Sequence, residues 1–226
     1  MLKSVAAAGA AACVLVLAAS GAQAAAHPDF TGMWKVTAFV PAIKTDKGAL
    51  PPLRPEAKKI YEQRIADRAA KRDVHDPIDT CVPHGVPRLM FAPYPMLLLQ
   101  SNGQLDLIQE ANHTTRLIYL DAAPVDPEDP KWLGDSTGRW QGATLVVQTI
   151  NNDHRTWLDK AGLPHSDDMK VTERLSMGKG GKTLTDVITI DDPKTYTAPW
   201  TTTVRFNRVP GVMDLKESVC VRDHRM

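Results

Sequence analysis

The sequence predicts a mostly β protein: an antiparallel, lipocalin-like or calycin-like barrel of about 8–10 strands with one accessory N-terminal α-helix. Strand-like segments follow one another from residue 96 onward, and short turns rich in Gly and Asn separate them. Only residues 54–72 show helical periodicity over several turns. Consecutive hairpins give a meander, and closing a long meander into a barrel removes its exposed edges. Barrels of this size can enclose one small ligand.

The N-terminus is expected to be a secretory signal peptide. Lys3 supplies a positive charge, an Ala-, Val- and Leu-rich run follows, and Ala22-Gln23-Ala24 has the small-x-small pattern of a cleavage site. The apolar run is shorter than the ~20 strongly apolar residues that a membrane anchor needs. We therefore expect a signal peptide at residues 1–24, a single β-barrel domain at residues 25–226, a periplasmic or secreted location, and no membrane span in the mature form.

Charge and cysteine content limit the kinds of partner and the cellular compartment that we expect for this protein. The chain has 27 basic and 26 acidic residues, so it lacks the basic excess typical of a nucleic-acid surface. Only Cys81 and Cys220 follow the signal peptide. An oxidising compartment favours one disulfide bond between them. Closing a loop of this length would stabilise the fold by roughly 4–5 kcal/mol on the chain-entropy model. The alternative is two separate buried thiols.

The first elements of the chain precede the main series of strands. We expect a strand at residues 30–36 and one surface helix between Arg54 and Arg72, where Pro55 suits the first helical position. The charged face of this helix is interpreted as a solvated face rather than a binding site. Residues 74–95 are irregular and marked by prolines. A long ordered loop of this kind is often functional or held covalently.

The remainder of the chain is expected to be almost entirely strand and turn. Asn102-Gly103 is a strong type I′ hairpin signal, and Gly142 and the run 178–181 mark two further tight turns. The expected strands cover residues 96–101, 104–110, 114–120, 138–141, 143–150, 170–177, 182–190, 200–209 and 213–221.

Strand alternation places acids on apolar faces. Glu173, Asp186 and Glu217 each share a face with apolar neighbours at i ± 2. A carboxyl inside a barrel is costly unless paired or protonated, and burial raises its pKa toward the range useful for acid–base chemistry. The alternative is that each acid pairs with backbone N–H groups or with one of the arginines Arg88, Arg116, Arg174, Arg205 and Arg208.

The polar insertion at residues 151–168 would border the open mouth of such a barrel. It carries His154, Trp157 and His165. Histidines titrate near physiological pH and can serve as acid, base or metal ligand. Eleven residues apart and without a third ligand at a recognisable spacing, the two histidines do not predict a metal site. No phosphate loop, dinucleotide fingerprint or Gly-x-Ser-x-Gly is present, so no cofactor is expected.

Residues 134–147 begin Gly-Asp-Ser and include Trp140. Asp135 next to a serine is compatible with a hydrolase site. The favoured interpretation is that Asp135 and Ser136 are turn residues that hydrogen-bond the local backbone, and that Trp140 anchors the core before a tight turn.

These segments resemble an uncharacterised family of exported bacterial proteins. The similarity lies in Asp-Phe-Thr-Gly-x-Trp (29–34), Cys-x-Pro-x-Gly-x-Pro-Arg (81–88), Gly-Asp-Ser-x-Gly-x-Trp-x-Gly-x-Thr-Leu-Val-Val (134–147), Trp-Leu-Asp-x-x-Gly-x-Pro-His-Ser (157–166), Glu173-Arg174 and Glu-x-x-Cys (217–220). It covers most of the mature chain and implies no settled activity. The Gly-x-Trp of the first strand is also similar to the opening of lipocalins, which are ligand-binding barrels.

Two functions follow as hypotheses. The first is a cofactor-independent acid–base enzyme (lyase, isomerase, dehydratase or hydrolase) acting on a small, largely apolar molecule inside the barrel. Its predicted catalytic residues are Glu173, His165, Arg174 and Asp135, and its predicted substrate-binding residues are His154, Trp157, Glu217 and Trp140. The second is a non-catalytic periplasmic carrier of a small ligand. A structural role in the cell envelope is a third possibility.

Overall fold

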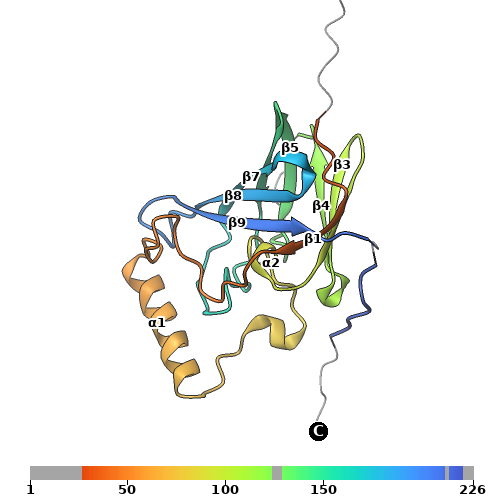
Figure 1. Ribbon diagram of the computed structural model, residues 1–226. Helices are drawn as coiled ribbons and strands as arrows, with labels where there is room; N and C mark the ends of the chain where they lie inside the picture. Colours follow the sequence, from red (N-terminus) through yellow and green to blue (C-terminus); the bar gives the residue numbers. More distant parts are fainter. Residues whose placement is uncertain (1–26, 124–128, 212–213, 221–226) are drawn as a thin grey trace, which may run out of the picture.

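Nine strands form a closed barrel in the computed structural model, which describes residues 27–123, 129–211 and 214–220 (Figure 1). The strands are β1 (Gly32–Val36), β2 (Met96–Gln100), β3 (Gln104–Gln109), β4 (Thr115–Leu120), β5 (Asp135–Gln141), β6 (Thr144–Ile150), β7 (Lys170–Met177), β8 (Thr183–Asp191) and β9 (Trp200–Arg208). Each strand pairs with the next, and β1 pairs with β9 to close the barrel. The predicted fold class, a mostly β barrel with an accessory helix, is confirmed.

The barrel departs from a purely antiparallel meander at one place. β4 and β5 pair in parallel over only three residue pairs, from Ile118 with Ser136 to Leu120 with Gly138. Strand directions that alternate around a closed ring return to their starting direction only if the number of strands is even. Nine strands therefore require a parallel pair, and β4 and β5 provide it.

This topology gives the barrel two unlike ends. The hairpin turns that join β2 to β3, β5 to β6 and β7 to β8 lie at one end. The long segments 37–95, 151–169 and 192–199 all connect strands at the opposite end, which is the lower end in Figure 1. The polar insertion thus borders the barrel mouth, as the sequence predicts. We call this the loop end.

The loop end carries the helices that precede β2. α1 (Pro55–Ala69) begins at Pro55, as predicted, and stands beside the barrel at the lower left of Figure 1. A short 3-10 helix, η1 (Pro77–Thr80), follows within the proline-marked loop. α2 (Arg88–Phe91) was not foreseen, and all four of its residues are buried. Gln109 on β3 donates a hydrogen bond to the Leu89 carbonyl at 2.7 Å, which ties α2 to the barrel.

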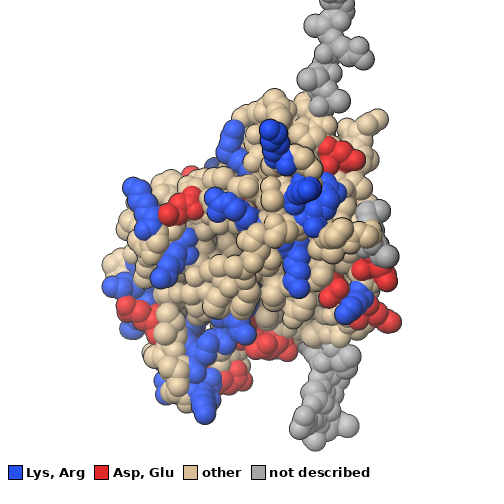
Figure 2. All heavy atoms as spheres, viewed as in Figure 1, with Lys and Arg blue, Asp and Glu red and all other residues tan. Residues whose placement is uncertain are grey.

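Alternation along the strands separates a buried interior from an exposed outer wall. The interior is filled by one cluster of apolar side chains that includes Trp34 on β1, Leu98 on β2 and Phe206 on β9. The outer wall of the face shown in Figure 2 carries interspersed basic and acidic side chains, α1 among its elements. Most of the helical charge run is exposed, as interpreted, but Arg64 is half-buried against Trp157 and Arg68 borders a cavity. Among the described residues, no helix is long and apolar enough to cross a membrane.

The C-terminal segment corrects one predicted element. Residues 214–220 form no strand, and Glu217 is exposed, so the expectation of a tenth strand with an interior Glu217 is wrong for the described part of that segment. The β1–β9 pairing leaves no free barrel edge for another strand. Cys81 and Cys220 form the predicted disulfide bond, with their Cα atoms 5.6 Å apart across 139 positions of sequence. The signal peptide lies outside the described residues.

Candidate functional site

Glu173 lies in the barrel interior, as the alternation on β7 predicts, and is wholly buried. It pairs with Arg116 of β4, which is 2 % exposed. Arg116 donates to both carboxylate oxygens, with Nη1 at 2.8 Å from Oε1. Its other N–H groups reach the hydroxyls of Ser136 at 3.1 Å and Thr149 at 2.7 Å. Glu173 is therefore paired with an arginine, which is the alternative given above for the buried acids.

Asp186 of β8 is a second buried acid beside this ion pair. Its side chain is wholly buried, and neither carboxyl oxygen accepts a hydrogen bond among the described residues, whereas a protonated Asp186 could donate one to Glu173. Burial raises the pKa of Asp186 well above its ordinary value, and the nearby charge of Glu173 raises it further, whereas Arg116 opposes the shift. The interior therefore holds one acid paired with arginine and a second acid whose burial favours the neutral form, a division that acid–base enzymes also use.

His165, the second predicted catalytic residue, does not contact Glu173. His165 is 6 % exposed at the loop end, where a hydrogen bond of 2.8 Å joins its Nε2 to the hydroxyl of Thr156. Its Nδ1 lies 3.0 Å from the Ser166 carbonyl oxygen. Burial lowers the pKa of His165, against the hydrogen bond at Ser166 and the charge of Asp192. Among the described contacts, none links His165 to Glu173.

The other predicted catalytic residues lie on the outer wall or at its edge. Arg174 is exposed and donates to Gln141 at 3.2 Å. Asp135 accepts from Lys131 at 2.6 Å and from Asn151 at 3.0 Å. Burial alone would raise the pKa of Asp135, but these two hydrogen bonds bring it below its ordinary value. Asp135 therefore fastens the start of β5, where it also borders a surface cavity at the β4–β5 seam.

The predicted aromatic contacts lie far apart in the fold. Trp140 is near the hairpin end of β5, where its ring stacks on His27 at 4.5 Å. Trp157 is buried at the loop end, with the Arg64 guanidinium of α1 at 4.2 Å from its ring centre. Trp157 thus helps to hold α1 against the insertion, while Trp140 covers the opposite end of the core. The two residues do not line one site.

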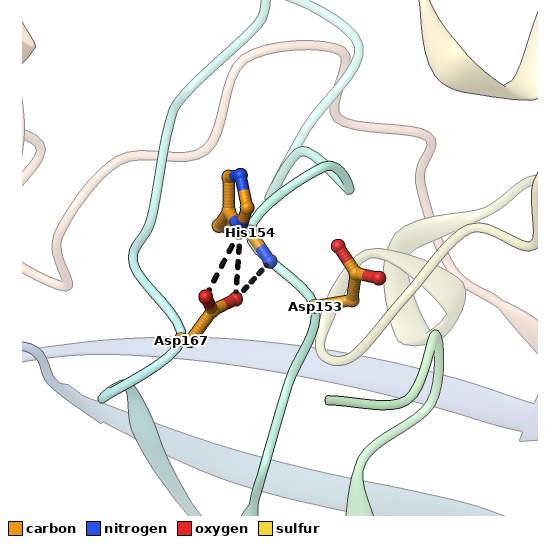
Figure 3. Close-up of side chains that lie close together, drawn as sticks. All are labelled: Asp153, His154 and Asp167. Carbon is orange, nitrogen blue, oxygen red and sulfur yellow. Dashed lines mark hydrogen bonds and ion pairs between the residues drawn. The ribbon is translucent and has the colours of Figure 1, made fainter. Parts of the chain in front are cut away.

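His154 belongs to a surface group with two aspartates (Figure 3). One potential ligand atom from each of Asp153, His154 and Asp167 lies within 4.8 Å of the others. His154 already contacts both oxygens of Asp167, at 2.9 and 3.0 Å, and Asp153 is taken by Arg155 at 2.9 and 2.5 Å. His154 and Asp167 are largely exposed. These contacts already occupy the potential ligand atoms, so we propose no metal at this group. The expectation that the protein binds no metal stays a prediction.

A separate cavity at the loop end brings together groups that the sequence analysis did not select. This loop cleft has a volume of about 210 Å³ and is bordered by α1, η1, α2 and the insertion. Its apolar lining comes from Phe39, Val40, Phe91 and Tyr94, and its polar lining includes His84, Arg68, Asp76, Asp79, Arg88, Asp159 and Lys160. Concave sites of this kind, apolar with a few converging polar groups, are the usual form of a small-molecule site.

His84 is the distinctive group of the loop cleft. It is 8 % exposed and lines the cleft, and its ring nitrogens take part in none of the described hydrogen bonds and are not among the fully enclosed polar atoms. Its ring meets that of Tyr94 edge-on at 6.3 Å. Burial lowers the pKa of His84 to about 4, and the charge of Arg88 acts in the same direction against that of Asp76. The imidazole is therefore neutral near pH 7, with one nitrogen able to accept and the other to donate.

The surroundings of His84 are held firmly. Arg88 and Asp76 form a two-pronged ion pair, at 2.8 and 2.7 Å, that joins α2 to η1. Gly85 has φ +74°, and a Cβ there would lie 2.7 Å from the Thr156 hydroxyl, so this position requires glycine. Thr156 is the partner of His165, so the predicted histidine supports the loop that carries His84.

Asp159 forms the inner side of the cleft. It accepts backbone hydrogen bonds from Ile43 at 2.9 Å, Gly162 at 2.8 Å and Leu163 at 2.9 Å. Burial raises the pKa of Asp159, and these three hydrogen bonds oppose the rise. The carboxyl is thus engaged in shaping the insertion, whereas His84 is left to meet a ligand.

The sequence did carry one signal for this cleft. Its main segment is the irregular loop 74–95, whose length and prolines mark it as functional or covalently held. The Cys81–Cys220 disulfide bond shows that this loop is held covalently. His84 could not be singled out because its burial and its neighbours Asp76 and Arg88 depend on tertiary packing.

No family model and no curated protein matches this chain. The resemblance to exported bacterial proteins therefore stays a prediction. The motifs behind it have structural roles in the fold: Gly85, Arg88 and Asp159 shape the loop end, and Ser136 and Glu173 belong to the interior ion-pair network.

Proposed function

We propose that this protein binds a small, largely apolar molecule in the loop cleft and acts as a ligand-binding or carrier protein. The observation that carries the proposal is the buried His84, which lines the cleft beside Phe91 and Tyr94 and takes part in none of the described hydrogen bonds. The ring nitrogens of His84 are not among the enclosed polar atoms that lack a partner, so they are open to the cleft, where a ligand can hydrogen-bond to them. The proposal moves the expected site from the barrel interior to its loop end.

The cleft suits binding better than catalysis. Its buried carboxyls, Asp76 and Asp159, are occupied by Arg88 and by backbone N–H groups respectively, and its third carboxyl, Asp79, is exposed. A histidine with a pKa of about 4 is a weak base near neutral pH, yet it is a good neutral hydrogen-bonding group. The predicted catalytic residues Glu173, Arg174 and Asp135 do not line the cleft.

The test uses a substitution that fills the cleft from its exposed side. Val40 lines the cleft and is 38 % exposed, so Val40→Trp should occlude the cavity without disturbing the core. Val209→Trp is the matched control, because Val209 is 36 % exposed and does not line the cleft. The mature, oxidised proteins are incubated with a small-molecule extract of the source organism, and retained compounds are identified by mass spectrometry. The proposal expects one compound class retained by wild type and by Val209→Trp but lost from Val40→Trp. Equal retention by all three proteins would place the site elsewhere.

An acid–base enzyme is the second candidate, favoured by the raised pKa of the buried Asp186 beside the Glu173–Arg116 pair. In this alternative, Glu173 and Asp186 would exchange a proton with a substrate admitted to the interior. Glu173→Gln and Asp186→Asn are compared with wild type for consumption of compounds from the same extract. Turnover by wild type that both variants lose, while remaining folded by circular dichroism, would support the enzyme. A compound retained unchanged by all three would support the carrier.

Export to the periplasm or the exterior belongs to the same proposal. The disulfide bond supports it, because such bonds persist in oxidising compartments. N-terminal sequencing of the protein recovered from cell fractions tests it. A mature N-terminus near Ala25 in the periplasmic or secreted fraction is expected, and an intact Met1 in the cytoplasm would contradict it.

A further inference from the structure

The ligand class can be narrowed from the size of the loop cleft, if the proposed function holds. The cavity measures about 210 Å³. An engineered apolar cavity of about 150 Å³ accommodates benzene. The loop cleft therefore has room for a single six-membered ring with one small substituent, and a fused polycyclic molecule would not be enclosed.

The walls favour an aromatic ring. Phe91 is 5 % exposed and forms part of the inner wall, while Phe39 and Tyr94 are both about half exposed at the rim. Aromatic side chains on several sides allow edge-to-face and offset contacts with a bound ring. These contacts stabilise a planar ligand beyond the burial of its apolar area.

The polar groups favour a neutral ligand with one hydroxyl. Among the buried polar side chains of the cleft, His84 takes part in none of the described hydrogen bonds, whereas Arg88 directs one N–H of each terminal nitrogen at Asp76. Charges of both signs face the cleft: Arg68, Arg88 and Lys160 against Asp76, Asp79 and Asp159. Since these charges balance, no net attraction selects an anion or a cation. A hydroxyl can donate to the unprotonated nitrogen of His84 without bringing a charge into the cavity.

We propose that the loop cleft binds a monocyclic phenol whose ring packs against Phe91 and Tyr94 and whose hydroxyl donates a hydrogen bond to the imidazole of His84. This inference rests on the proposed function. It commits the site to a neutral aromatic alcohol rather than to any small apolar compound, and it assigns His84 as the residue that determines specificity.

Three probes of similar size separate the possibilities: phenol, toluene and benzoate. Each is titrated into the ¹⁵N-labelled mature protein, and the amide signals of Gly85, Ala92 and Tyr94 report occupancy of the cleft. Loss of one buried hydrogen bond costs about 1–3 kcal/mol, which corresponds to roughly 5- to 150-fold in affinity. We therefore expect phenol to bind at least about fivefold more tightly than toluene, and benzoate to bind more weakly than phenol.

Two variants identify the source of that preference. His84→Phe keeps a ring but removes both nitrogens, so toluene should bind it at least as tightly as phenol. Tyr94→Phe is the matched control, since it removes the other polar atom near the ring and should leave the phenol preference unchanged. Loss of the preference in Tyr94→Phe but not in His84→Phe would overturn the assignment of His84.

The outcomes also separate this inference from the proposed function. Equal binding of phenol and toluene at the cleft signals would overturn the phenol inference and leave a small apolar ligand in place. Tighter binding of benzoate would overturn it in favour of an anion. If none of the three probes shifts the cleft signals, and the extract yields no compound lost from Val40→Trp, the proposed function fails as well.

Discussion

The barrel interior and the loop cleft both contain buried polar groups, but they differ in how those groups are partnered. In the interior, Arg116 is satisfied by Glu173, Ser136 and Thr149. In the cleft, His84 is left without a partner among the described residues. The comparison teaches that burial of a titratable group does not by itself mark a binding site. A group satisfied by its own protein is engaged in the fold, whereas an unsatisfied group bordering a cavity is free to meet a ligand.

Asp186 is the informative intermediate between these cases. Its oxygens are unpartnered among the described residues, yet it lines neither the loop cleft nor the cavity at the β4–β5 seam. Burial raises its pKa, which favours the neutral carboxyl over a buried charge. An interior group can thus lower its cost by protonation, while a cleft group can do so by binding.

The largest expected effect comes from breaking the interior ion pair. Arg116→Met leaves Glu173 buried without its partner, and such a change destabilises proteins by about 3–5 kcal/mol. The free energy of unfolding, measured by urea denaturation, should fall by this amount. The double variant Arg116→Met/Glu173→Leu should recover much of the loss, because it removes both charges. A loss below about 1 kcal/mol in the single variant would show that the pair is not enclosed as described.

Removal of the disulfide bond is expected to have the second-largest effect on stability. Removing a native disulfide bond typically costs about 2–5 kcal/mol, and this one closes a loop of 139 positions. Cys81→Ser/Cys220→Ser should therefore unfold at a lower urea concentration. Since Cys81 lies in the loop that carries His84, the double variant should also bind the cleft ligand more weakly. Unchanged binding in a folded, destabilised variant would mean that the bond does not support the cleft.

The lowered pKa of His84 predicts that the stability of the fold decreases as the pH falls. The pKa of His84 falls from 6.5 in the unfolded chain to about 4 in the folded protein, so between these values the unfolded chain binds more protons. Stability attributable to His84 is complete above about pH 6.5 and declines as the pH falls toward 4, by about 3 kcal/mol in total. His84→Gln should lack this decline. Parallel unfolding curves for the two proteins from pH 7 to 4 would contradict the burial of a neutral His84.

The smallest effect is expected at Asp186. A raised folded-state pKa means that stability is lost as pH rises above the unfolded value near 3.9. Asp186→Asn removes this loss and keeps the shape of the side chain. The variant should be at least as stable as wild type at pH 7, and its advantage should shrink as the pH falls toward 4. A large destabilisation at pH 7 would show that Asp186 is ionised and engaged.

Local sequence pattern predicted most of the barrel. The Asn102-Gly103 turn joins β2 to β3, as predicted. The alternation in β7 and β8 correctly placed Glu173 and Asp186 inside the barrel. The pattern failed at residues 214–220, where apolar alternation is present but the closed barrel offers no edge for pairing. It also missed the parallel β4–β5 pair, because that pairing follows from the total number of strands rather than from any one segment.

The candidate site was harder to predict than the fold. Glu173 has the sequence pattern of a buried acid whether it pairs with Arg116 or faces a substrate, and 57 positions separate these two partners. His84 lies among prolines and a glycine in a segment without periodicity. Its neutrality depends on burial and on Arg88, which only the folded arrangement of η1 and α2 brings together.

The most direct test of the loop cleft as the ligand site is a crystal structure of the mature protein with the compound that it retains from its source. The account predicts electron density for a small ring between Tyr94 and Phe91, with a polar atom within hydrogen-bond distance of His84. Density for the compound in the barrel interior beside Glu173 and Asp186, with the loop cleft empty of it, would contradict the account and favour the acid–base enzyme.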